Sequence, residues 1–132
     1  MPPRYLREVE LYTDARGRSQ VHDEFKRIAR SDARGKRAIQ NKVDLLRQQS
    51  LEDALRSRLI KKPSATLYVL RVQSGPVSYR LPFFEPPCRG GALVVLTSAA
   101  HRRDLRGDAY AELLAEAERL RQDWIQRNCK GG

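Results

Sequence analysis

The 132-residue chain has few of the features that mark several classes of protein. It has only two cysteines, Cys88 and Cys129, which do not have metal-ligand spacing and do not support a disulfide framework. No apolar run approaches the roughly 18 residues that span a bilayer. The opening Met1-Pro2-Pro3-Arg4 lacks the apolar stretch of a signal peptide. We therefore expect a single cytoplasmic domain over residues 1–132, with two inert thiols, and not a membrane protein, a secreted scaffold or a zinc finger.

Acidic residues are scarce in one part of the chain only. The whole chain has 26 Lys and Arg against 16 Asp and Glu, a formal net charge of +10. The segment from Arg56 to Arg106 contains ten basic and two acidic residues, whereas the segments on either side are nearly balanced. Most of the cations are Arg, which suits bidentate phosphate contacts. A GC-rich genome would explain the preference for Arg but not the shortage of acids, so we expect an acidic partner such as a nucleic acid.

The first half of the chain predicts one strand followed by helices. Polar and apolar residues alternate over Glu8–Tyr12, as in a half-buried strand. Ser19 is a suitable N-cap for a helix, and Asp32 can end that helix and cap the next. Two helices so closely joined indicate an antiparallel hairpin. Ser50 and Asp53 have the spacing of a capping box and predict a short helical turn, under which Leu55 and Leu59 are expected to pack.

Three strands are predicted in the second half. Leu67–Val72 and Val77–Phe84 are rich in β-branched and aromatic residues and flank a turn at Gly75. Pro82 lacks an N–H, which predicts an edge position or a bulge in the second of these strands. The continuous apolar run Ala92–Thr97 is typical of a central strand covered on both faces.

A long amphipathic helix begins near Asp108, and residues 128–132 are expected to be a frayed tail. The predicted order is β-α-α-β-β-β-α, with a core over about residues 8–124. The fold class is therefore α+β: a small antiparallel sheet with one face covered by the N-terminal helical hairpin and the C-terminal helix.

The order of these motifs resembles the RelE/ParE toxin superfamily. The sequence Leu67-Tyr68-Val69-Leu70-Arg71-Val72 is followed by Tyr79-Arg80-Leu81, an apolar strand and a basic loop before the last helix. Within the superfamily the chain is most similar to the phage-derived, HigB-type toxins of type II toxin-antitoxin systems, and the resemblance covers about residues 8–124. It implies the RelE-like fold and a ribosome-dependent endoribonuclease that cuts mRNA and inhibits translation.

The resemblance also implies which residues form the site. The residues that match the family's pattern are Arg71 and Arg80 on the strands, His101, Arg102 and Arg103 in the basic loop, and Tyr110 near the start of the last helix. Some members carry two lysines on the first strand of the meander, where this chain has Val69 and Arg71. Lys61 and Lys62 lie just upstream and are candidates to replace them.

These residue types suit RNA cleavage, because the RNA 2′-OH can attack the adjacent phosphorus without a metal or cofactor. Arg71 and Arg80 on adjacent strands are placed to clamp one phosphate, and His101 is the one residue of the basic segment that exchanges protons near neutral pH. Tyr110 either packs in the core, stacks on a base or transfers a proton. We assign catalysis to Arg71, Arg80, His101 and Tyr110, and RNA binding to Lys61, Lys62, Arg102 and Arg103. The identity of the general base is not assigned. For each of these lysines and arginines, the alternative is an ordinary surface residue in contact with solvent.

Two other functions fit the same pattern. A ParE-like DNA gyrase inhibitor has the same fold and needs no acid or base, and a non-catalytic RNA-binding or ribosome-binding module needs only the positive surface. For the first hypothesis the expected partners are mRNA, the ribosome and a cognate antitoxin, often a helix-turn-helix protein encoded by an adjacent gene. No membrane partner is expected. His22 is expected at the surface.

Overall fold

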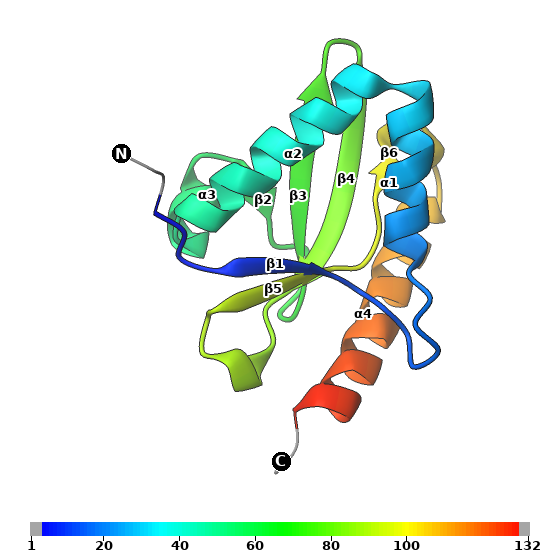
Figure 1. Cartoon of the computed structure of the whole chain (residues 1–132). Coiled ribbons are helices and arrows are strands. Elements are labelled where there is room, and N and C mark those ends of the chain that lie inside the picture. Colours follow the sequence, from blue (N-terminus) through cyan, green and yellow to red (C-terminus); the bar gives the residue numbers. More distant parts are fainter. Residues whose placement is uncertain (1–3, 130–132) are drawn as a thin grey trace.

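Residues 4–129 are described by a computed structural model, and in this range the chain forms four α-helices and six strands (Figure 1). The expected α+β class is confirmed. The elements in chain order are β1 Glu8–Leu11, α1 Gln20–Ser31, α2 Ala33–Gln48, α3 Leu51–Arg56, β2 Ile60–Lys61, β3 Tyr68–Ser74, β4 Val77–Phe84, β5 Leu93–Leu96, β6 Ala100–His101 and α4 Ala109–Asn128. Two short 3₁₀ helices, Pro87–Arg89 and Arg102–Asp104, precede β5 and follow β6. No helix in this range combines the length and apolar content needed to cross a bilayer.

The sheet is mixed, so the expectation of a purely antiparallel sheet is wrong. Its strand order is β1-β5-β4-β3-β2, and β6 lies beside β4. The hairpin of β3 and β4 is antiparallel as predicted, but β1 runs parallel to β5, with Glu8 opposite Leu93 and Leu11 opposite Leu96. A parallel pair needs a long crossover connection. The chain supplies one through both helices of the hairpin and the strands that follow.

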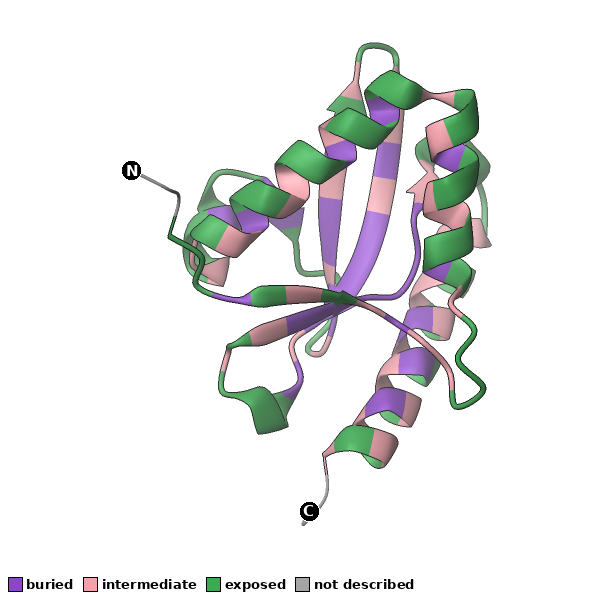
Figure 2. Ribbon diagram, viewed as in Figure 1, coloured by how far each residue is buried: buried purple, intermediate pink, exposed green. Residues whose placement is uncertain are grey.

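Helices cover both faces of the sheet, not one face as expected. Neighbouring residues of a strand point to opposite faces, and in β4 Phe83 packs with the cluster under α1 and α2, whereas Phe84 packs with Trp124 of α4. Both phenylalanines are buried, and Figure 2 shows the buried residues running along β4 and into β5. Val94 and Val95 are likewise buried on opposite faces, which confirms that this run is a strand covered on both sides.

The helix starts follow the predicted caps. The side chains of Ser19, Asp32 and Ser50 accept hydrogen bonds from backbone N–H groups in the first turns of α1, α2 and α3. Leu59 is buried as expected, but Leu55 is exposed, because the short helix α3 buries only Ala54. His22 lies at the surface, as expected.

Pro82 lies in an inner strand and not at an edge. On one side β4 pairs with β3, with Pro82 opposite Val69. On the other side β4 pairs with β5 through Phe83 and with β6 through Arg80, so Pro82 falls where the partner strand changes. Its carbonyl accepts hydrogen bonds from the backbone N–H and hydroxyl of Thr97 at 2.9 and 3.1 Å. The missing N–H is tolerated because no ladder bond is needed at this break.

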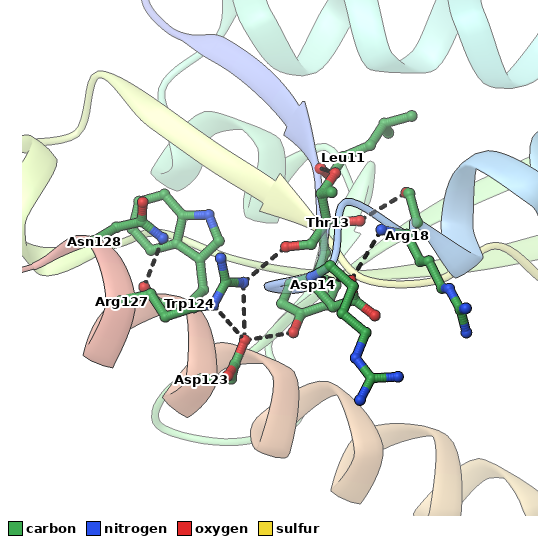
Figure 3. A network of polar contacts seen from close by, with 11 residues as sticks. Leu11, Thr13, Asp14, Arg18, Asp123, Trp124, Arg127 and Asn128 are labelled. Atoms are coloured by element: carbon green, nitrogen blue, oxygen red, sulfur yellow. Dashed lines mark hydrogen bonds and ion pairs between the residues drawn. The ribbon is translucent and has the colours of Figure 1, made fainter.

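The C-terminal half of α4 is fastened to the segment after β1 by a polar network (Figure 3). The Tyr12 hydroxyl donates to Asp123 Oδ2 at 2.5 Å, and Arg127 donates to Asp123 and to the Thr13 carbonyl. Asn128 is still helical, so α4 extends into the expected tail, and residues 130–132 lie outside the described range.

Cys88 and Cys129 are joined by a disulfide, with Cα atoms 5.6 Å apart. The expectation of two inert thiols is therefore wrong. The bond links the 3₁₀ helix before β5 to the end of α4. The signal was absent from the sequence, because a pair 41 residues apart in a chain with only two cysteines follows no recognisable pattern.

Candidate functional site

Arg71 and Arg80 are directly opposite each other in the β3–β4 hairpin. Their neighbours Val72 and Tyr79 belong to the cluster under α1 and α2, so the two arginines point to the other face of the sheet. Both are half-buried. Directly opposed side chains of antiparallel strands have Cβ atoms about 5 Å apart. The fold therefore holds two positive charges side by side.

The surroundings of Arg80 disfavour its charge. Burial lowers the pKa of its guanidinium, and the charges of Arg71 and Arg102 lower it further, whereas Tyr110 acts in the opposite direction. One Arg80 nitrogen donates to the Tyr79 carbonyl at 3.0 Å. An anion placed between these cations would relieve their repulsion.

Five of the eight predicted site residues line one cavity of about 240 Å³. These residues are Lys61, Arg71, Arg80, Arg102 and Tyr110, and Val69 and Leu105 complete the lining. No acidic side chain lines it. On α4, by contrast, Arg119, Arg121 and Arg127 each contact a carboxylate three or four residues away. Among residues 4–129, the four cations of the cavity have no carboxylate within 4 Å.

Tyr110 lies in the first turn of α4 and is half-buried. It is absent from both apolar clusters of the described chain, which are formed on this side by Ala117, Leu120 and Trp124. Its position in the cavity wall therefore favours a role at the site over the alternative of a core residue.

Lys62 lies in the adjoining cavity of about 610 Å³, which shares Lys61, Arg71 and Tyr110 with the first one. Its ammonium is 5.0 Å from the ring centroid of Tyr68, within the range of a cation–π contact. It therefore extends the positive surface next to the arginine pair.

His101 is not brought together with the arginine pair. It lies opposite Tyr79 in the β6–β4 pairing, with the two rings edge to face at 5.4 Å, so its side chain points to the face opposite that of Arg80. It lines a separate cavity of about 440 Å³ with Arg103 and Arg106, and this cavity meets the first one at Arg102 and Leu105.

The hydrogen bonding of His101 also limits its chemistry. Its Nδ1 accepts a hydrogen bond from the backbone N–H of Arg103 at 3.2 Å. With Nδ1 engaged as an acceptor, Nε2 is the ring nitrogen that remains free to donate to a ligand. Arg103 is exposed, and its closest carboxylate is that of the adjacent Asp104, at 3.9 Å.

Sequence reasoning missed Arg58, which lines the cavity shared with Lys62 and Arg71. It directly follows the C-cap of α3 and has φ = 64°. This left-handed conformation favours glycine after a helix. No signal in the sequence marks the position, because a short helix ending in Ser57-Arg58 is also compatible with an ordinary turn.

Within the described residues, no group of three or more His, Cys, Asp or Glu side chains has an arrangement that could hold a metal ion. Comparisons with protein-family models, curated proteins and solved structures find no match for this chain.

Proposed function

We propose that this protein is the toxin of a type II toxin-antitoxin system and acts as a ribosome-dependent mRNA endoribonuclease. The observation that carries the proposal is the cavity in which Lys61, Arg71, Arg80, Arg102 and Tyr110 meet without an acidic side chain. The sequence resemblance supplies the specific substrate, and the geometry supports binding of a phosphate.

The proposed reaction uses the nucleophile that RNA carries. Arg71, Arg80 and Arg102 hold the scissile phosphate and stabilise the negative charge that develops on its oxygens. The 2′-oxygen attacks phosphorus as its proton leaves to a base, and the departing 5′-oxygen receives a proton. The products are a 2′,3′-cyclic phosphate and a 5′-hydroxyl.

Lys61 and Tyr110 are the cavity side chains able to exchange these protons, because arginine stays protonated in proteins. His101 does not take part in this proton transfer, because it lies on the other face of the sheet with its Nδ1 already bonded. His101 then contributes at most a contact to RNA through the adjoining cavity.

A toxin of this kind acts on one partner, the ribosome with its mRNA, and is inhibited by another, the antitoxin. Ribosome-bound mRNA is the substrate, the cytoplasm is the site of action, and an antitoxin encoded by an adjacent gene, often a helix-turn-helix protein, restrains the toxin. The unpaired cations of the cavity are a surface that an antitoxin could cover with acidic residues.

Primer extension on mRNA with purified ribosomes tests the proposal. Arg80→Ala should reduce the cleavage rate about 10²–10³-fold, the usual cost of removing one charge-stabilising donor. Tyr110→Phe, which removes a proton-transfer group, should reduce it about 10²–10⁴-fold. The charge-matched control is Arg30→Ala, which removes an exposed arginine from α1 outside the cavity and should cut normally. His101→Ala should retain cleavage within a few-fold.

The same assay separates the rival functions. An intact message at saturating protein refutes ribonuclease activity, and double-strand DNA breaks in expressing cells would then select gyrase inhibition. Salt-sensitive RNA binding with neither cleavage nor growth arrest would select a binding module. A fully active Arg80→Ala, Tyr110→Phe double variant would refute the site and leave the activity itself standing.

A further inference from the structure

Two further cavities extend the basic surface from Arg71 toward the helices. One, of about 500 Å³, lies between α2 and β3 and is lined by Lys42, Arg58, Arg71 and Arg80 together with uncharged residues. The other, of about 610 Å³, shares Arg58 and Arg71 with it. No acidic side chain lines either cavity. They meet at Arg58 and Arg71, which line both cavities.

Arg58, which lines both cavities, has an unfavourable backbone conformation. It is the one non-glycine residue with positive φ among residues 4–129, and glycine would adopt φ = 64° without strain. Its side chain is exposed and makes no hydrogen bond or ion pair within the described chain. No internal contact explains an arginine here, which points to a partner outside the chain.

Apolar side chains interrupt the positive charge. Two of the four exposed large apolar residues of the described chain, Leu45 and Leu55, line the same two cavities, with 37% and 36% of their surface exposed. Cations at intervals with apolar contacts between them match a single-stranded nucleic acid, whose phosphates and unstacked bases are both accessible. A duplex keeps its base faces stacked inside and would leave the leucines without a partner.

We propose that this groove, defined by Lys42, Leu45, Leu55 and Arg58, binds the nucleotides that flank the phosphate held by Arg71 and Arg80, as single-stranded RNA. The inference rests on the proposed function, which places the scissile phosphate at the arginine pair. Arg58 is then a positioning residue: it contacts a neighbouring phosphate and fixes the register of the strand.

Binding of uncleavable RNA tests the groove separately from cleavage. Single-stranded oligonucleotides with 2′-O-methyl groups lack the attacking hydroxyl, and we compare lengths of about three and about nine nucleotides. The variants are Arg58→Gly, which suits the backbone, and Lys42→Ala in α2. The charge-matched control is Arg16→Gly in the exposed turn between β1 and α1, outside the three cavities.

Wild type should bind the longer RNA more tightly than the short one, and Arg58→Gly should lose most of this gain while binding the short RNA normally. Each lost phosphate contact lowers the salt slope by about 0.7 for single strands, so the affinity drop between about 50 mM and about 200 mM salt should shrink about 2.5-fold. Arg58→Gly should melt at or above the wild-type temperature, since glycine removes the backbone strain.

Equal binding of the longer RNA by wild type, Arg58→Gly and Lys42→Ala overturns the inference, as does preference for a duplex of the same length. Failure of wild type to bind either oligonucleotide also overturns it. None of these three results bears on cleavage of ribosome-bound mRNA, so the proposed function is refuted only by its own assay. Reduced binding by Arg16→Gly equal to that of Arg58→Gly would show a net-charge effect and refute a defined groove.

Discussion

Tyr79→Phe should destabilise the fold without affecting the site. Tyr79 is 4% exposed and its hydroxyl donates to Asp32 Oδ2 at 2.7 Å, while Asp32 Oδ1 caps α2 by accepting from the Gly35 N–H at 2.9 Å. One carboxylate thus joins β4 to the start of α2. The Tyr79 hydroxyl, followed by the Gly35 N–H, holds the pKa of Asp32 below its usual range. Burial, followed by Asp32, raises the pKa of Tyr79 to about 12.

The expected loss follows from the type of bond. Hydrogen bonds to charged groups contribute about 1.5–3 kcal/mol. Asp32 is only half-buried, so water can replace the hydroxyl, and we expect the lower end, about 1.5 kcal/mol. At an unfolding entropy of about 2.1 cal/mol/K per residue, this chain would melt about 5 °C lower. Because Tyr79 and Arg80 point to opposite faces, cleavage well below the melting temperature should be unchanged.

The pH dependence gives the sharper test. A carboxylate with a lowered folded pKa stabilises the protein above its unfolded pKa, and this contribution disappears as the pH falls through the folded value. The stability gap between wild type and Tyr79→Phe, measured by urea unfolding, should therefore be full at pH 7 and shrink below about pH 4. A gap under about 0.3 kcal/mol at pH 7, or one of equal size at pH 7 and pH 3, would refute the role of the charged acceptor.

Three further changes probe the scaffold. Gly35→Ala should cost about 2 kcal/mol in thermal unfolding, because the new Cβ would lie 2.7 Å from Asp32 Cγ and displace the cap; unchanged stability would contradict this. Burial raises the pKa of Glu24, which accepts from the Ser98–Ala99 segment, so its stability contribution falls as the pH rises through the folded value. Glu24→Gln should match or exceed wild type at pH 7, whereas Glu24→Ala should lose about 1–3 kcal/mol, and equal behaviour of the two would count against the geometry. Cys88→Ser should lower the free energy of unfolding by about 3–4 kcal/mol under oxidising conditions and have no effect in dithiothreitol.

Local signals in the sequence were sufficient for the local structure. The caps at Ser19, Asp32 and Ser50 depend on a side chain and a backbone N–H three residues away, so the spacing alone predicts them. The opposition of Arg71 and Arg80 follows in the same way from a short hairpin turn, which fixes the register of the two strands. This is why the sequence could predict that the two arginines lie side by side on adjacent strands.

Long-range pairing was not accessible in this way. The position of His101 depends on β6, a strand of two residues that pairs with β4 only because the partner of β4 changes at Pro82. A shift of one residue in that register would turn the imidazole to the face of Arg80. A strand as short as β6 leaves no periodic pattern in the sequence. The sequence therefore indicated a histidine in the basic loop but not the face of the sheet to which its side chain points.

The arginine pair of the candidate site destabilises the fold. Like charges directly opposite in a sheet are destabilising, yet Arg71 and Arg80 face each other with Arg102 nearby and no carboxylate within 4 Å in the described chain. On α4 the same chain places a carboxylate within reach of each of three arginines. An acidic residue in place of Val69 or Leu105, both in the cavity wall, would neutralise the pair. A phosphate bound between the two arginines would take the place of the missing acid and convert this internal repulsion into affinity.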